Sequence, residues 1–126
     1  MREFKFRAWY KPTKKMFEVF SFNKDFVFEN TQDGIHTNPT NPAKRKDCVI
    51  MQYTGLKDRN GKEVYEGDCL QNENKGEIFA MYWENNKSRF SMKDKLGLIW
   101  GIIDLSKHLE VIGNIIETPE LLQEEK

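Results

Sequence analysis

The sequence predicts a mainly β protein, built of small β-barrel or SH3-like sheets with short helical turns. Apolar and polar residues alternate with period two in several short segments, which is typical of strands with one buried face. The clearest of these covers residues 76–83. Turn residues separate the segments, and the dipeptide Asn60-Gly61 suits the positive backbone angles of a tight turn.

We expect a hairpin at the N-terminus. Phe4, Phe6 and Ala8 alternate with charged or polar neighbours, residues 10–15 form a turn, and residues 16–22 supply the second strand. Residues 26–28 are a short third candidate.

Residues 30–47 are predicted to form a long surface loop. The segment is polar and contains Asn38-Pro39 and Asn41-Pro42, with little to bury. A loop of this length is uncommon in a compact domain, which indicates a binding or assembly role.

The second half continues as strands. These are residues 49–53, 69–71, 76–83 and 89–92. The last three, after Gly67-Asp68, resemble the early meander of a small SH3-like barrel.

The C-terminal part begins with an ambiguous apolar run at residues 96–105, either a buried strand or a short helix. Residues 108–116 are a predicted strand with Gly113 inside it, where a bulge or a close backbone approach is expected. Thr118 and Pro119 suit the cap and the first position of a final helical turn.

The length of 126 residues fits one domain. We expect an N-terminal β lobe at about 1–53 and a C-terminal β-barrel lobe at about 54–126. Twenty basic and twenty acidic residues balance. Residues 1–63 carry a net charge of +5 and residues 64–126 one of −5, and we expect packing of the halves to cancel most of this asymmetry.

Cys48 and Cys69 are expected to be reduced thiols inside strands, since they lack metal-ligand spacing. His36 and His108 also lie outside any metal-binding pattern, so no metal and no cofactor is expected. The N-terminus has no apolar signal run, and no segment reaches membrane-spanning length. We therefore expect a cytoplasmic protein without membrane contact.

Three blocks of sequence resemble one known family. They are residues 5–9 followed by 14–16, residues 51–68, and residues 110–115 followed by 118–122. Together these blocks resemble the YopX family of phage and prophage proteins. The resemblance implies a mainly β, oligomeric protein of a bacterial host's phage or prophage, with no assigned molecular function and no catalytic residues.

The central block is interpreted as a structural turn. A phosphate-binding loop is excluded because five residues separate Gly55 from Gly61 and Glu63 follows Lys62. The family-signature residues assigned to this turn are Tyr53, Gly55, Asp58, Asn60, Gly61, Tyr65, Gly67 and Asp68.

Basic and aromatic residues interleave near the N-terminus, a pattern by which small β-barrels bind single-stranded nucleic acid. The candidates are Lys5, Arg7, Trp9, Tyr10, Lys11, Lys14 and Lys15. The competing interpretation, a hairpin with core aromatics and solvated lysines, is favoured by the neutral overall charge.

A third alternative is a metal-dependent hydrolase. Glu66 and Asp68 are two residues apart and would share one strand face, where a carboxylate pair can do acid–base or magnesium chemistry. We favour instead a role in salt bridges and turns.

The preferred function is a non-catalytic interaction or assembly module that forms homo-oligomers. A phage or host protein and nucleic acid are the other candidate partners.

Overall fold

The computed structural model describes residues 4–30, 42–73, 76–101 and 105–123. The chain divides into two compact units, Met1–Gln52 and Tyr53–Lys126. The prediction of a mainly β fold is confirmed, since antiparallel strands dominate the described residues and their longest helical elements have four residues.

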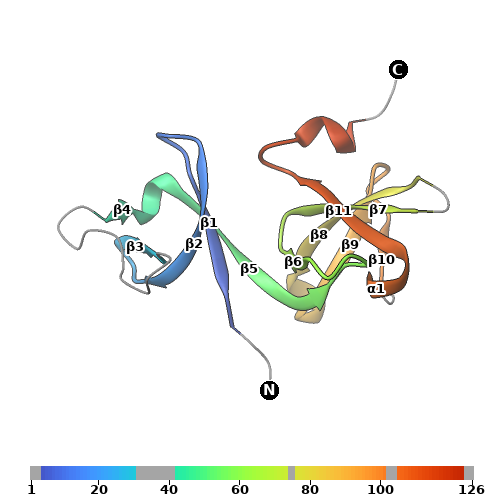
Figure 1. Ribbon diagram of the computed structural model, residues 1–126, viewed down its shortest axis with the longest axis horizontal. Coiled ribbons are helices and arrows are strands. Elements are labelled where there is room, and N and C mark those ends of the chain that lie inside the picture. Colours follow the sequence, from blue (N-terminus) through green and yellow to red (C-terminus); the bar gives the residue numbers. More distant parts are fainter. Residues whose placement is uncertain (1–3, 31–41, 74–75, 102–104, 124–126) are drawn as a thin grey trace. The chain divides into compact units, whose positions relative to one another are not determined.

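The first unit is an antiparallel sheet in which the predicted N-terminal hairpin is confirmed. Tyr10 pairs with Lys15 and Phe6 with Val19 across it. Its strands follow the order β4-β3-β2-β1-β5 (Figure 1). The elements are β1 (Phe6–Tyr10), β2 (Lys15–Phe22), β3 (Phe26–Glu29), β4 (Ala43–Lys44), the 3-10 turn η1 (Arg45–Asp47) and the first part of β5 (Cys48–Lys57).

The predicted loop at residues 30–47 is wrong at its C-terminal end. Ala43 pairs with Val27, and this pairing helps to bury the Val27 side chain to 1% exposure. A short edge strand therefore forms in a segment whose polar composition indicated a loop. Residues 31–41 lie outside the described part of the chain.

Strand β5 is longer than predicted and belongs to both units. Its first part pairs with β1, and the part from Tyr53 onward pairs with β6 (Glu63–Tyr65). The register shifts between Tyr53 and Leu56, where Gly55 lies. The buried Thr54 hydroxyl donates to the Val64 carbonyl at 2.7 Å.

The second unit contains the predicted meander, in a sheet of order β10-β9-β8-β7-β11. A cluster of buried apolar side chains holds it together. The further elements are β7 (Asp68–Asn72), β8 (Ile78–Glu84), η2 (Asn85–Lys87), β9 (Arg89–Asp94), β10 (Ile99–Trp100), α1 (Leu105–His108), β11 (Leu109–Asn114) and η3 (Pro119–Leu122). The core residues are Val64, Leu70, Phe79, Met81, Phe90, Met92 and Leu109.

The predicted C-terminal β-barrel lobe is an open sheet. In the described residues the two edge strands, β10 and β11, do not pair with each other, so the sheet is open. The physical reason lies at both edges: β10 has only two residues, and the outer side of β11 bonds to the turn that follows β5.

The apolar run at 96–105 is neither a buried strand nor a single helix. Leu96 and Leu98 are 72% and 56% exposed, and β10 is an exposed edge strand. Residues 102–104 lie outside the described part, and α1 begins at Leu105.

The expected irregularity in the last strand is confirmed. The register of β11 against β7 shifts between Val111 and Gly113. Thr118 occupies the N-cap position of η3 and Pro119 follows it, as predicted, but the Thr118 side chain does not bond to the turn. Its hydroxyl accepts the Asn114 N–H and donates to the Asn114 carbonyl, each at 3.0 Å. This folds the C-terminal turn onto Gly113. A Cβ at position 113 would lie 2.1 Å from Thr118 Oγ1 and 2.9 Å from Leu121 Cδ1.

Replacing Gly113 by Ala is expected to lower the free energy of unfolding by about 2–3 kcal/mol, because the added methyl group forces Thr118 and Leu121 apart. Urea unfolding of wild type and variant measures this. Gly101→Ala is the control, since a Cβ there meets nothing within 4 Å and should change stability little. Equal stability of the two variants would show that the C-terminal turn does not pack on Gly113.

Candidate interaction site

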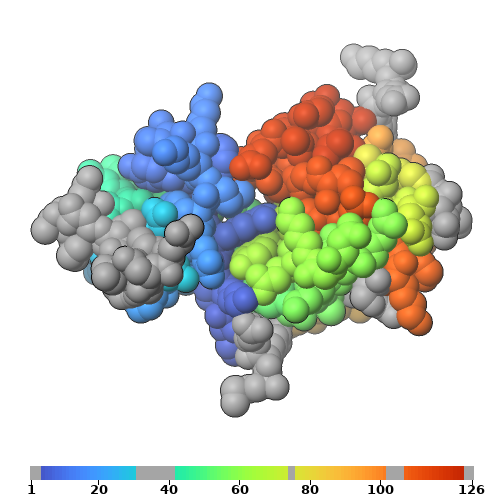
Figure 2. Space-filling model, in the orientation of Figure 1, coloured from blue at the N-terminus to red at the C-terminus, as the bar shows by residue number. Residues whose placement is uncertain are grey.

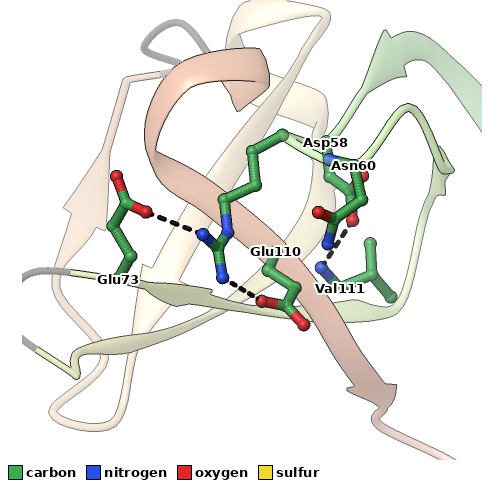
Figure 3. A network of polar contacts seen from close by, with 6 residues as sticks. Asp58, Asn60, Glu73, Glu110 and Val111 are labelled. Carbon is green, nitrogen blue, oxygen red and sulfur yellow. Dashed lines mark hydrogen bonds and ion pairs between the residues drawn. The ribbon is translucent and has the colours of Figure 1, made fainter.

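Asp58 is a buried carboxylate at the start of the turn between β5 and β6. Its Oδ1 accepts the backbone N–H groups of Asn60 and Lys62, each at 2.9 Å. Its Oδ2 accepts the N–H of Val111, also at 2.9 Å, from strand β11 (Figure 3). Burial acts to raise the pKa of Asp58, but these three donors stabilise the charged form and bring the pKa below 3.8.

Arg59 fastens the same turn from its outer side. Its backbone N–H donates to the Leu109 carbonyl at 2.9 Å. Its guanidinium is paired with Glu73, at 2.7 Å, and with Glu110 (Figure 3). Figure 2 shows the green atoms of the turn region beside the orange-red atoms of the C-terminal segment. The outer edge of β11 is thus covered by the turn.

The rest of the signature block is also structural. Gly61 has φ +81°, as a tight turn requires, and its N–H donates to the Asp58 carbonyl at 3.0 Å. The rings of Tyr53 and Tyr65 lie 5.5 Å apart. Asp68 is 1% exposed and accepts the Tyr65 N–H at 2.7 Å.

The opposite edge of this sheet carries exposed apolar side chains. The hairpin of β9 and β10 presents Leu96, Leu98, Ile99 and Trp100, which are 72%, 56%, 52% and 46% exposed. We call these four residues the apolar hairpin. Exposed apolar side chains that are contiguous, rather than scattered singly, mark interaction sites.

Asp94 holds the apolar hairpin in one conformation. Its carboxylate accepts the backbone N–H groups of Leu96 and Leu98 and the indole N–H of Trp100, each at 2.9 Å. The hydrogen bond from Trp100 is the main cause that lowers the pKa of Asp94 below 3.8. Trp100 also packs edge-on against the buried ring of Phe79.

The free side of β10 offers backbone hydrogen-bonding groups. Hydrogen-bonded and non-bonded pairs alternate between antiparallel strands. The Asp94 N–H donates to the Leu98 carbonyl, so the next pair, Lys93 and Ile99, is a non-bonded one. The N–H and C=O of Ile99 therefore point away from β9.

The predicted nucleic-acid residues of the N-terminal hairpin do not share one face. Alternation places Arg7 and Trp9 on one side of β1 and Tyr10 on the other. The Arg7 guanidinium donates a hydrogen bond to the sulfur of the buried Met51, at 3.7 Å. Tyr10 and Lys15 instead line a cavity of about 240 Å³.

The remaining candidates complete the hairpin. Lys5 immediately precedes β1 and is half-buried, whereas Lys11 and Lys14 are exposed in the turn before β2.

The residues of the hydrolase hypothesis are placed differently from the prediction. Glu66 lies in the turn between β6 and β7, and Asp68 begins β7, so they do not share a strand face. Within the described residues, no three His, Cys, Asp or Glu side chains gather as metal ligands. His36 lies outside the described part.

Both cysteines are free thiols. Burial, followed by the nearby Asp68, raises the pKa of Cys69 to about 11, and burial also raises the pKa of Cys48. A raised pKa keeps the thiol protonated and therefore a poor nucleophile at neutral pH.

The chain is thus a two-unit, open-sheet β protein whose central turn is structural and whose second sheet has, among the described residues, an exposed apolar edge. It belongs to the YopX family, whose model (YopX protein) matches residues 5–123. It is similar to protein EF1440 from Enterococcus faecalis, solved by crystallography, with 27% identity and a TM-score of 0.70 over 98% of this chain and 100% of that one. A comparison with curated proteins finds no match. No described helix is both long and apolar enough to span a membrane.

Sequence reasoning missed the apolar hairpin as an exposed feature. The run of Leu, Ile and Trp looked like a segment to be buried. The available signal was Asp94 followed by Gly97, a polar acceptor and a turn glycine at the start of that run.

Replacing Asp58 by Ala is expected to lower the free energy of unfolding by about 2–4 kcal/mol, because three backbone N–H groups lose their acceptor. Chemical denaturation measures the loss. Arg59→Gln, in the same turn, should cost much less, since its ion pairs are exposed and its backbone N–H remains. A larger loss for Arg59→Gln would reverse the assigned roles.

The contribution of the Asp58 charge should depend on pH. Because its folded-state pKa is lowered, this contribution is fully present above its unfolded pKa of about 3.9 and is lost as the pH falls through the folded value. The stability difference between wild type and Asp58→Asn should therefore be largest near pH 7 and shrink below pH 4. Denaturation at several pH values checks this, and a difference that grows on acidification would contradict it.

Proposed function

We propose that this protein is a non-catalytic assembly module that self-associates through the apolar hairpin, with β10 of one copy pairing with β10 of another. The observation that carries the proposal is the contrast between the two edges of the second sheet. The turn at Asp58 and Arg59 covers β11, whereas the apolar hairpin exposes four apolar side chains and the strand edge of β10. Exposed edges of this kind are usually blocked in monomeric proteins.

A second copy of the chain is the occupant that this surface fits. An antiparallel pair of identical edge strands has twofold symmetry, so each copy supplies the same donor and acceptor at Ile99. The apolar side chains then cover each other. Lys93 and Lys95 flank Asp94 and are exposed, so their ammonium groups can remain in water when the strands meet.

The interface is expected to be weak and reversible. Stable dimers bury roughly 800 Å² on each partner, and a typical largest apolar patch of about 300–600 Å² supplies only part of this. The fixed hairpin conformation favours binding nonetheless, because little side-chain or loop freedom is lost on association. We expect a dissociation constant in the micromolar range.

The phage or prophage setting and a cytoplasmic location in the bacterial host are part of the same proposal. The family resemblance supports the phage or prophage setting in a bacterial host, whereas the geometry of β10 supports the assembly role.

Ile99→Lys is expected to weaken dimerisation by about tenfold or more, because a desolvated charge would face its own copy. Sedimentation equilibrium at micromolar concentrations measures it. Ile99→Pro keeps an apolar side chain but removes the outward N–H, and should also weaken the dimer.

The control is Ile115→Lys, which places the same charge at a residue of similar exposure, 45%, in the same unit. It should dimerise like wild type. A wild-type protein that stays monomeric at about 100 µM would end the proposal, as would Ile99→Lys and Ile99→Pro variants that associate like wild type.

A further inference from the structure

Three lysines and one partly exposed aromatic ring line the same hollow in the first unit. Lys24, Lys44 and Lys46 line an open hollow of about 340 Å³ together with Phe26, which is 37% exposed, and Asp25. We call Lys24, Phe26, Lys44 and Lys46 the lysine cluster. It lies at β3 and β4, an edge of the first sheet, away in sequence from the basic residues of the N-terminal hairpin.

Strand pairing brings the ring and one cation together. Phe26 and Lys44 are directly opposite in the register of β3 and β4. Residues paired in this way project to the same face of a sheet, with their Cβ atoms about 5 Å apart. Lys24 comes from the turn before β3 and Lys46 from η1 after β4, so three backbone segments place cations in the hollow that Phe26 lines.

The backbone under the cluster is held by polar contacts. The Asn23 side chain accepts the N–H groups of Asp25 and Phe26, at 2.9 and 2.8 Å. Arg45 donates its backbone N–H to the Asp25 carbonyl and its guanidinium to the Asn23 carbonyl, and it lies 5.0 Å from the Phe22 ring centroid. Arg45 thus joins η1 to the turn before β3 by hydrogen bonds, while the three lysine side chains are exposed to solvent.

The hollow carries more positive than negative charge. Among the residues that the structure describes, no ion pair involves Lys24, Lys44 or Lys46. Asp25 is the one acidic residue lining the hollow. The first unit as a whole holds ten Lys and Arg against six Asp and Glu, a net charge of +4. The balanced charge of the whole chain therefore conceals a basic unit.

Cations spaced around an exposed ring match the chemistry of a single nucleic-acid strand. Phosphates are contacted by lysines, and an unpaired base has a face that stacks on an aromatic side chain. A free phosphate would use the lysines but not the ring. An acidic peptide would likewise gain little from stacking on Phe26. The combination favours a nucleotide chain.

We propose that the lysine cluster is a binding site for single-stranded nucleic acid, with Phe26 stacking a base and Lys24, Lys44 and Lys46 contacting the flanking phosphates. This site replaces the N-terminal hairpin as the nucleic-acid candidate. It is independent of self-association, which uses residues of the other unit.

The test measures binding of a fluorescein-labelled oligothymidylate of about 12 nucleotides to the full chain by fluorescence anisotropy. The variant Lys24→Gln, Lys44→Gln and Lys46→Gln is expected to bind about tenfold or more weakly at low salt. Its plot of log K against log salt should be shallower by about 2, because three phosphate contacts are lost.

A matched control removes three charges from the N-terminal hairpin: Lys11→Gln, Lys14→Asn and Lys15→Gln. Asn suits position 14 because the backbone there has φ +55°. This variant should bind nearly like wild type. Asp25→Asn should bind more tightly, since it removes the one negative charge of the hollow.

Phe26→Leu tests the base-stacking role. Loss of the ring should weaken oligothymidylate binding about fivefold or more while leaving binding of polyglutamate unchanged. Thermal unfolding confirms that each variant folds.

Three results would overturn the proposal. The first is a wild-type chain that does not bind the oligonucleotide, and the second is a hairpin control that loses as much affinity as the cluster variant. The third is polyglutamate bound as tightly as the oligonucleotide, which would indicate an acidic protein partner instead.

Discussion

The second unit depends on one buried carboxylate. Asp58 accepts two N–H groups from its own turn and one from Val111, so a single side chain shapes the turn after β5 and joins it to the last strand. A buried charge is tolerated only when its acceptor sites are filled, and here backbone donors fill them. The hydrogen bond between Val111 and Asp58 fixes the turn after β5 against β11. The core residues Val64 and Leu109 lie on the strands next to this contact, β6 and β11, and Leu70 lies on β7, which pairs with β11.

The same junction divides the sheet into a protected edge and an open one. With the turn bonded along β11, the sheet does not close on β10, and the apolar hairpin stays at the surface. Asp94 repeats the principle on a smaller scale, since one carboxylate gathers two backbone N–H groups and the Trp100 indole. Asp58 thus accounts for the covered edge at β11, and Asp94 for the conformation of the exposed edge at β10.

The two proposed activities use different chemistry in different units. Self-association depends on apolar side chains and a strand edge in the second unit, whereas nucleic-acid binding depends on cations and one ring in the first. A protein that assembles and holds a single strand would gain avidity from the repeated sites. The described residues offer no gathered ligands for a metal, and the two thiols have raised pKa values.

The sequence by itself determined the mainly β class, the N-terminal hairpin, the meander after Asp68 and the irregularity at Gly113, because period-two alternation and turn residues are local signals. It also indicated the family, through the block around Asn60-Gly61. Only the tertiary structure decided that Asp58 accepts a hydrogen bond from Val111, that the sheet stays open, and that Lys24, Lys44 and Lys46 line one hollow with Phe26. Each of these brings together backbone segments distant in sequence, and period and composition carry no information about such long-range pairing. The exposure of residues 96–100 was also decided by the tertiary structure. Hydrophobicity predicts burial, but it does not indicate that the turn after β5 covers β11 and leaves β10 at the surface.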